Sequence, residues 1–345
     1  MNPPPEPPGG LAVRDLAVQY GDPARPTRAV RGVSFDLAPG EILGIAGESG
    51  SGKSSIAFAV LGLLPDGTSV AGEVVAGGRD LLAMSGRELR AVRGAEVGMV
   101  FQEPMTALNP VLRVGALLAS AARAHHRLSR AQARDLAERA VVDVGLDPRV
   151  LRRYPSELSG GMSQRVVIAM SLVSGARTLI ADEPTTALDV TVQSRILSLI
   201  ARLRRERGMS CLLISHDLSV LAQVCDRILV MYAGEIVETG PAAELLSRPR
   251  HPYTSALVQC RIDPRDQGQF KAIPRRLRDQ PDGGCRFYGR CGVAEPACAE
   301  HPIELTDLGD GQVRCRRSAD IGDALMAEVS AALEEAAAVP ERAQP

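Results

Sequence analysis

Gly47-Glu-Ser-Gly-Ser-Gly-Lys53-Ser54 decides how the rest of this 345-residue chain is interpreted. It follows the apolar run Ile42–Ala46 and precedes Ser55–Leu64, which has the pattern of an amphipathic helix. The spacing G-x-x-x-x-G-K-S between a buried strand and a helix is typical of a phosphate-binding loop. Glycines let successive backbone N–H groups face a polyphosphate, and the helix start adds the positive end of its dipole. The sequence therefore predicts a nucleotide site here rather than a plain glycine-rich turn.

Each side chain of this loop has an expected place in that site. Lys53 is suited to reach the β- and γ-phosphates, and the Ser54 hydroxyl is suited to hold Mg²⁺. Tyr20 ends an alternating strand and carries one of the chain's few aromatic rings, which stacks on adenine or serves only in packing. The remaining candidates for nucleotide contact are Gly47, Glu48, Ser49, Gly50, Ser51, Gly52 and Ser55.

Composition limits the class of protein. The chain is 45% hydrophobic and 23% charged, which suits an ordinary globular core, and its formal net charge of -1 gives no support for a bulk nucleic-acid binder. We find no apolar run of the roughly eighteen residues that a bilayer span needs, and the proline-rich start lacks the pattern of a secretion signal. We therefore expect a cytoplasmic protein, in which seven cysteines serve as free thiols or metal ligands.

Strand and helix patterns alternate along most of the chain. This alternation predicts a parallel α/β core with an antiparallel element at one side. Between the strands, residues 111–150 have a helical pattern that contains a capping box at Ser129 and Gln132. Strands are expected at residues 11–20, 33–37, 42–46, 97–101, 178–182, 211–215, 227–230 and 235–238, and further helices at 166–173, 190–207 and 321–338.

Asp182 and Glu183 follow a fully apolar strand, Thr178–Ala181. Open α/β sheets bind their ligands at the carboxyl ends of such strands. Beside a phosphate loop, Asp182 would hold Mg²⁺ through water and Glu183 would polarise the attacking water. A surface acidic pair is the alternative, but such pairs seldom follow a strand of this kind.

Six motifs in this order resemble those of an ABC transporter ATPase. They look like the Walker A loop, Q-loop, signature, Walker B motif, D-loop and switch histidine, and they are Gly47–Ser54, Gln102, Leu158–Met162, Asp182-Glu183, Ala187–Asp189 and His216. The resemblance covers roughly residues 11–260. It implies a RecA-like parallel-sheet core, an antiparallel β subdomain and a helical subdomain at about 106–175. Met162 departs from the commoner glutamine, while the signature residues Ser159, Gly160 and Gly161 are intact.

The resemblance also implies how the site is completed. Gln102 would sense Mg²⁺ and the attacking water, and His216 would contact the γ-phosphate. The signature and Asp189 would meet nucleotide held by a second ATPase subunit, so that two subunits close head-to-tail over two ATP molecules.

Two segments and a cysteine set resemble one branch of the family. Gln102–Pro110 and His251–Thr254 look like segments of oligopeptide and dipeptide importer ATPases, in which the first contacts a coupling helix of the membrane subunit. The branch implies a cysteine-rich extension at 261–320, with a disordered start at 1–10 and a tail at 321–345. The [4Fe–4S] cluster of this branch has ligands that look like Cys285, Cys291, Cys298 and Cys315. Zinc and free thiols are the alternatives. Zinc is less favoured, because the short paired cysteine spacing of most zinc sites is absent.

The expected function is that of an ATP-hydrolysing subunit of a peptide importer, peripheral on the cytoplasmic face of the plasma membrane. The expected partners are a second, homologous ATPase chain, two transmembrane permease subunits and an extracytoplasmic peptide-binding protein, with no nucleic acid. Importers of nickel, glutathione or sugar use the same ATPase type, so the cargo stays open. A soluble ABC ATPase that acts on nucleic acid or the ribosome is the more distant alternative.

Overall fold

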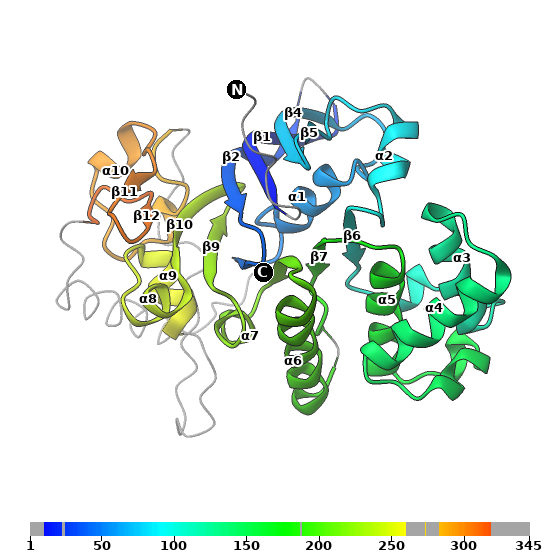
Figure 1. Ribbon diagram of the computed structural model, residues 1–345. Helices are drawn as coiled ribbons and strands as arrows, with labels where there is room; N and C mark the ends of the chain where they lie inside the picture. Colours follow the sequence, from blue (N-terminus) through cyan, green and yellow to red (C-terminus); the bar gives the residue numbers. More distant parts are fainter. Residues whose placement is uncertain (1–9, 23–24, 187, 260–272, 274–282, 319–345) are drawn as a thin grey trace, which may run out of the picture.

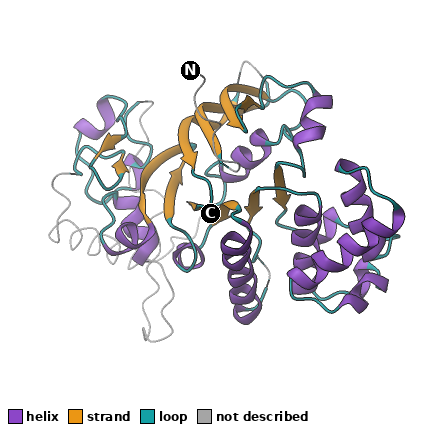
Figure 2. Ribbon diagram, viewed as in Figure 1, coloured by secondary structure: helices purple, strands orange, loops and turns teal. Residues whose placement is uncertain are grey.

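The computed structural model describes residues 10–22, 25–186, 188–259, 273 and 283–318. Two sheets organise this part of the chain, and helices surround them (Figures 1 and 2). The larger sheet has the strand order β11-β12-β10-β9-β3-β8-β7-β6, and the smaller has the order β2-β1-β4-β5.

The centre of the larger sheet is parallel. Every residue of three of its strands, β3, β7 and β8, is buried, which is the pattern of a sheet covered on both faces. Successive side chains of β3 enter two different cores, because strand side chains alternate between faces: Ile42 packs in one core, and Leu43 packs in the other. The parallel strands are β3 (Ile42–Ala46), β6 (Val97–Val100), β7 (Thr178–Asp182), β8 (Ser210–Ser215) and β9 (Arg227–Tyr232).

Helices cover this sheet on both faces. The first core contains α6 (Val190–Arg207) and α7 (Leu218–Ala222), and the second contains α1 (Lys53–Val60). The helix α6 has the bounds that the sequence predicts, because Asp189 caps its start and Gly208 ends it with a left-handed φ of 63°.

The smaller sheet is antiparallel, as expected. It consists of β1 (Leu11–Tyr20), β2 (Thr27–Leu37), β4 (Ser69–Ala76) and β5 (Arg79–Asp80), and α2 (Gly86–Val92) follows it. The prediction that the second strand begins at residue 33 was wrong, because β2 begins at Thr27. Tyr20 of β1 pairs with Thr27, so β2 follows β1 from that end, with an irregularity between Val13 and Leu16.

Three helices form a separate group on one side of the molecule (Figure 1). They are α3 (Val114–His125), α4 (Arg130–Asp143) and α5 (Gly160–Val173), with the short 3₁₀ turns η1 (Pro104–Ala107), η2 (Pro148–Arg152) and η3 (Pro155–Glu157) beside them. The capping box is confirmed: Ser129 N–H donates to Gln132 Oε1 at 2.9 Å and Gln132 N–H donates to Ser129 Oγ at 3.2 Å. The helical stretch predicted for residues 111–150 is therefore two helices, divided at this cap.

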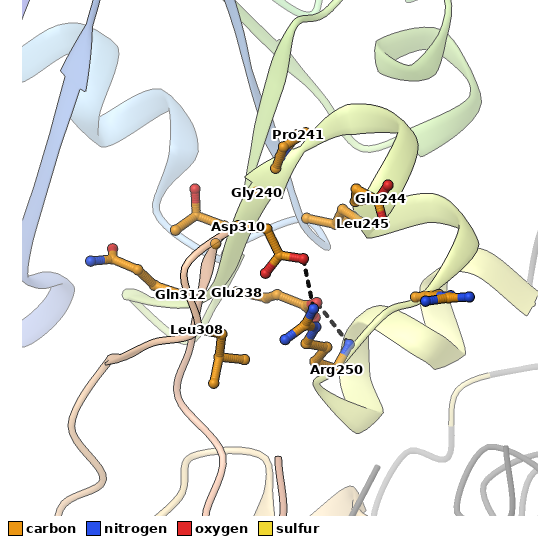
Figure 3. A pocket seen from close by; sticks show the side chains of 12 residues that line it. Glu238, Gly240, Pro241, Glu244, Leu245, Arg250, Leu308, Asp310 and Gln312 are labelled. Carbon is orange, nitrogen blue, oxygen red and sulfur yellow. Dashed lines mark hydrogen bonds and ion pairs between the residues drawn. The ribbon is translucent and has the colours of Figure 1, made fainter. Parts of the chain in front are cut away.

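The C-terminal part joins the larger sheet at its edge. The hairpin of β11 (Thr306–Asp307) and β12 (Gln312–Val313) extends the sheet, and β12 pairs antiparallel with β10 (Glu235–Pro241). Near this junction Arg250 forms an ion pair of 2.7 Å with Asp310 (Figure 3). The remaining elements are α8 (Ala242–Ser247), α9 (Pro252–Gln259), η4 (Tyr288–Arg290) and α10 (Ala297–Glu300).

Several expectations fall outside the described residues. These are the order of residues 1–9, the start of the extension at 261 and the helix at 321–338. Among the helices that the structure does describe, not one combines the length and the apolar character that crossing a bilayer requires.

Candidate nucleotide site

The phosphate loop connects the end of β3 to the start of α1. Gly47 has a φ of 149°, and a Cβ there would lie 2.3 Å from the carbonyl oxygen of Met231. Gly52 caps α1 with a φ of 102°, and a Cβ there would lie 2.2 Å from the carbonyl oxygen of Ala29. Only glycine fits at these two positions, so the backbone itself forms the cradle. The Ser51 hydroxyl oxygen is buried in this loop and has no hydrogen-bond partner among the residues that the structure describes, which suits a loop made to bind an anion.

Lys53 lies within the cradle. Its side chain is 5% exposed, and Nζ donates to the carbonyl oxygens of Gly47 and Glu48, both at 2.8 Å. Burial lowers the pKa of Lys53, whereas the nearby carboxylates of Glu183, Asp182 and Glu48 raise it. The ammonium is thus held at the loop by backbone oxygens, where it could make charge-assisted hydrogen bonds to phosphate oxygens.

The ends of neighbouring parallel strands bring Asp182 to this loop. β3 and β7 both pair with β8, where Ala46 lies opposite Ser215 and Asp182 lies opposite Ile214. Ser54 Oγ donates to Asp182 Oδ1 at 3.2 Å. Burial raises the pKa of Asp182, and the Ser54 hydrogen bond opposes that rise. A hydroxyl and a carboxylate oxygen therefore meet beside the loop, and oxygen donors of these kinds are the ligands that Mg²⁺ takes.

Two of the predicted catalytic residues, His216 and Gln102, converge on a carboxylate oxygen of the third, Glu183. Glu183 Oε2 lies 3.1 Å from His216 Nδ1, and it accepts hydrogen bonds from Gln102 Nε2 at 3.3 Å and from Thr186 Oγ1 at 2.8 Å. The Glu183 side chain is 15% exposed, whereas that of His216 is 57% exposed. Thr186 was not predicted, since a threonine three residues after a glutamate gives no signal of its own in the sequence. The Glu183 carboxylate is thus held by three side chains, those of Gln102, Thr186 and His216.

Glu183 also has an unusual backbone. Its φ is 46°, in the left-handed region that non-glycine residues seldom adopt. Its N–H donates to the carbonyl oxygen of Ile214 at 3.0 Å, which extends the pairing of β7 with β8 by one residue. Such conformations typically cost about 1–3 kcal/mol and persist where the surrounding structure enforces them. Here the turn directs the carboxylate away from the strand and toward Gln102 and His216.

Tyr20 and the signature residues occupy different places relative to the loop. Tyr20 Oη donates to Ser55 Oγ at 3.0 Å, so its ring lies beside the first turn of α1, and stacking on adenine stays a prediction. Ser159 caps α5, and α5 lies with α3 and α4, away from α1 (Figure 1). The structure therefore does not bring the signature to the chain's own phosphate loop. Asp189 caps α6 by accepting from the N–H of Val192 at 2.9 Å.

The four cysteines of the extension line one small, largely apolar cavity. The backbones of two of them are joined, because the Cys285 N–H donates to the Cys298 carbonyl oxygen at 2.8 Å. Burial raises the pKa of Cys285 to about 11 and that of Cys315 to about 12, so both are neutral thiols without a metal. Within residues 283–318 and the other described ranges, no three His, Cys, Asp or Glu side chains have the arrangement of a metal site. The cysteine ligand set therefore stays a prediction.

Comparisons with known proteins agree with this geometry. Residues 30–186 match the family described as ABC transporter, and residues 237–298 match the oligopeptide/dipeptide transporter C-terminal region. The dipeptide transport ATP-binding protein DppD of Escherichia coli is 41% identical over 317 residues, which are 90% of this chain and 97% of DppD. This chain belongs to the ATP-binding proteins of ABC transporters. A relative of Sinorhizobium fredii, named "Probable peptide ABC transporter ATP-binding protein y4tR", is 45% identical over 322 residues, 90% of this chain and 96% of its own length.

Solved structures show the same ABC ATPase fold. The dimeric structure of the ATP-binding cassette MJ0796 in a post-hydrolysis state with ADP and Pi is similar with a TM-score of 0.61 and 27% identity. The likeness covers 67% of this chain and 98% of that one. The parallel core, the antiparallel sheet and the helical group expected from the sequence are confirmed as the fold of an ABC ATPase.

Proposed function

We propose that this ABC ATPase energises the import of dipeptides and oligopeptides by hydrolysing ATP. The convergence of Gln102, Thr186 and His216 on Glu183, beside the phosphate loop, is the observation that carries the hydrolytic step. The match of residues 237–298 to the C-terminal region of peptide transporters supports the cargo class. The names of the relatives from S. fredii and E. coli support it as well.

The chain's own groups divide the work of hydrolysis. The loop amides and Lys53 take up phosphate charge, and Glu183 orients the attacking water and accepts its proton. His216 and Gln102 hold the Glu183 carboxylate in place. His216 would contact the γ-phosphate, and Gln102 would sense Mg²⁺ and the attacking water. Mg²⁺, when bound, neutralises phosphate charge, and the residues that would hold it are Ser54, Asp182 and Gln102. Tyr20 would stack on the adenine ring.

The exposed signature supports a head-to-tail pair of ATPase subunits. Ser159 and Gly160 are exposed at the start of α5, a helix of 14 residues whose first N–H groups form an anion site. A Cβ at Gly161 would lie 2.6 Å from a side-chain carbon of Val192, so this position has no room for a side chain. We propose that this surface, with Asp189, closes over nucleotide held by a homologous second chain.

The test of the hydrolytic role is Glu183→Gln. Removing a general base typically lowers the rate about 10²–10⁴-fold, so we expect that loss in kcat with ATP binding retained. Glu206→Gln is the matched control, because Glu206 is exposed at the end of α6. Both variants are measured by phosphate release in the assembled transporter. Near-normal hydrolysis by Glu183→Gln would remove Glu183 from this role.

We also propose that Cys285, Cys291, Cys298 and Cys315 hold a [4Fe–4S] cluster. Four thiols around one cavity suit such a cluster or zinc, because both bind four thiolates. Anaerobic purification should give close to four iron and four sulfide per chain, and Cys291→Ser should lose most of both. Cys211→Ser is the control, since Cys211 is fully buried in β8. Stoichiometric zinc without iron would favour the alternative metal, and neither metal would leave free thiols.

The location and the assembly follow from the same proposal. We place the chain on the cytoplasmic face of the plasma membrane, bound to two permease subunits and served by an extracytoplasmic peptide-binding protein. The proposed units are the ATPase domain at 11–260, with its helical subdomain at about 106–175, and the cysteine-rich extension at 261–320. Residues 1–10 and 321–345 flank them. Nickel, glutathione or sugar remain alternative cargoes, because an ATPase subunit does not touch the cargo, and a nucleic-acid partner is disfavoured by the net charge of -1.

A further inference from the structure

Glu48, the second residue of the phosphate loop, has contacts in two directions. Its carbonyl oxygen accepts from Lys53 Nζ at 2.8 Å, and its N–H donates to Tyr253 Oη at 2.9 Å. Its carboxylate forms a two-pronged pair with Arg290: Oε2 accepts from Nη1 at 2.7 Å, and Oε1 accepts from Nη2 at 2.9 Å. Arg290 belongs to the C-terminal lobe, the name used here for residues 283–318. One residue of the loop thus joins the phosphate-binding lysine to that lobe.

Aromatic side chains fix the position of Arg290. Its guanidinium carbon lies 5.6 Å from the ring centre of Tyr232 and 5.9 Å from that of Phe287, and Nη1 donates to Tyr232 Oη at 3.3 Å. The rings of Tyr232, Tyr253 and Phe287 contact one another with centre distances of 4.7–5.3 Å. The Arg290 side chain is only 18% exposed. Because its planar group is already held, little rotational freedom is lost when it pairs with Glu48.

The lobe that carries Arg290 is attached to the ATPase core at other places. β12 pairs with β10 through Val313, which is fully buried, and Arg250 binds Asp310. Arg286 of the lobe lies 3.5 Å from Glu235 of β10. The C-terminal lobe is therefore held against the larger sheet by contacts other than the pair of Arg290 and Glu48.

Electrostatics gives this pair a consequence for nucleotide binding. Glu48 is the only acidic residue between Gly47 and Ser54, and its charge would repel a polyphosphate in the cradle. A two-pronged guanidinium–carboxylate pair neutralises that charge and fixes the direction of the side chain. The same pair orients the backbone segment whose carbonyl oxygen holds Lys53.

We propose that Arg290 is a positioning residue for nucleotide binding, through which the C-terminal lobe sets the nucleotide affinity of the phosphate loop. The inference rests on the proposed nucleotide site. Arg290 does not touch nucleotide; it acts through Glu48. Arg290 directly precedes Cys291, which lines the cysteine cavity.

The test is a double-mutant cycle on the full-length chain, with MgADP affinity measured by calorimetry. Arg290→Met should weaken binding about tenfold, because it leaves the Glu48 carboxylate unpaired beside the phosphates. In the Glu48→Gln background the same change should alter affinity less than twofold, because the charge on which Arg290 acts is gone. In the assembled transporter, Arg290→Met should raise KM for ATP and leave kcat within twofold.

Matched variants separate the possible failures. Arg286 belongs to the same lobe and pairs with Glu235. The MgADP affinity of Arg286→Met should therefore stay within twofold of that of the wild-type chain. Arg290→Lys keeps the positive charge but loses the two-pronged geometry, so its MgADP affinity should lie between those of the wild-type chain and Arg290→Met. The lysine variant also provides the test if the methionine variant does not fold. An unchanged affinity in Arg290→Met, or an equal loss in both Glu48 backgrounds, would overturn the inference. Lys53→Met that binds MgADP normally would instead refute the nucleotide site itself.

Discussion

Glu183 shows what the sequence can and cannot say about a single residue. Its place after a buried strand predicts the chemistry of a general base, because the strand end faces the ligand edge of the sheet. Its left-handed backbone and its contact with Thr186 depend on how β7 pairs with β8. Arg290 was missed for a related reason: it lies 242 residues from Glu48 along the chain, and only the folded lobe brings the two together.

Glu238 is a buried carboxyl group whose titration should affect stability. It is 4% exposed at the junction with the C-terminal lobe, where one oxygen accepts from the N–H of Arg250 (Figure 3). The other oxygen accepts from the N–H of His251. Burial raises the pKa of Glu238 from 4.5 to about 7, and the hydrogen bonds oppose that rise. The folded protein thus binds this proton more tightly than the unfolded chain, so the free energy of unfolding should fall as the pH rises from 4.5 to 7.

The prediction is measured against Glu238→Gln, which cannot titrate. At about 1.4 kcal/mol per pKa unit, the wild-type protein should lose up to roughly 3 kcal/mol relative to the variant across this pH window. Urea unfolding at a series of pH values gives that difference. Glu244→Gln is the control, because Glu244 lines the pocket drawn in Figure 3 together with Glu238 but is exposed. A wild-type-minus-variant difference that does not change with pH would contradict the assigned pKa.

At the scale of elements, local capping signals predicted the ends of helices best. The capping box at Ser129 placed the start of α4 correctly, because its side chains satisfy backbone groups of their own helix. The predicted bounds of α6 are also correct, with Asp189 at its start and a left-handed Gly208 at its end. β2 began six residues earlier than predicted, since its start is set by pairing with β1 rather than by its own pattern. Strand ends made by a distant partner carry little signal in the strand itself.

The hairpin of β11 and β12 illustrates the same limit. Each strand has two residues, which is too short for an alternating pattern to identify. Their position becomes evident only where Val313 lies opposite Glu238 on the edge of the larger sheet. This small element attaches the C-terminal lobe to the edge of the larger sheet.

At the scale of the whole molecule, three large apolar side chains that follow Gln102 in the sequence are exposed. Val111 is 75% exposed, Met105 is 45% exposed and Leu112 is 39% exposed, all within ten residues of Gln102. Water contact with such side chains is unfavourable, and a group of them is typical of a surface that a partner covers. The resemblance of Gln102–Pro110 to peptide-importer ATPases implies that the partner is a permease subunit.

Val111→Asp tests this assignment, because a charge at the centre of a buried apolar contact is costly when it has no partner. We expect the variant to lose most of the permease that co-purifies with the wild-type chain in detergent, while its MgADP affinity stays within twofold. Val142→Asp is the control, since Val142 is also exposed, at 53%, but lies on α4 away from the Q-loop. Equal permease recovery with both variants would place the membrane contact elsewhere, and loss with both would indicate general destabilisation of the helical group.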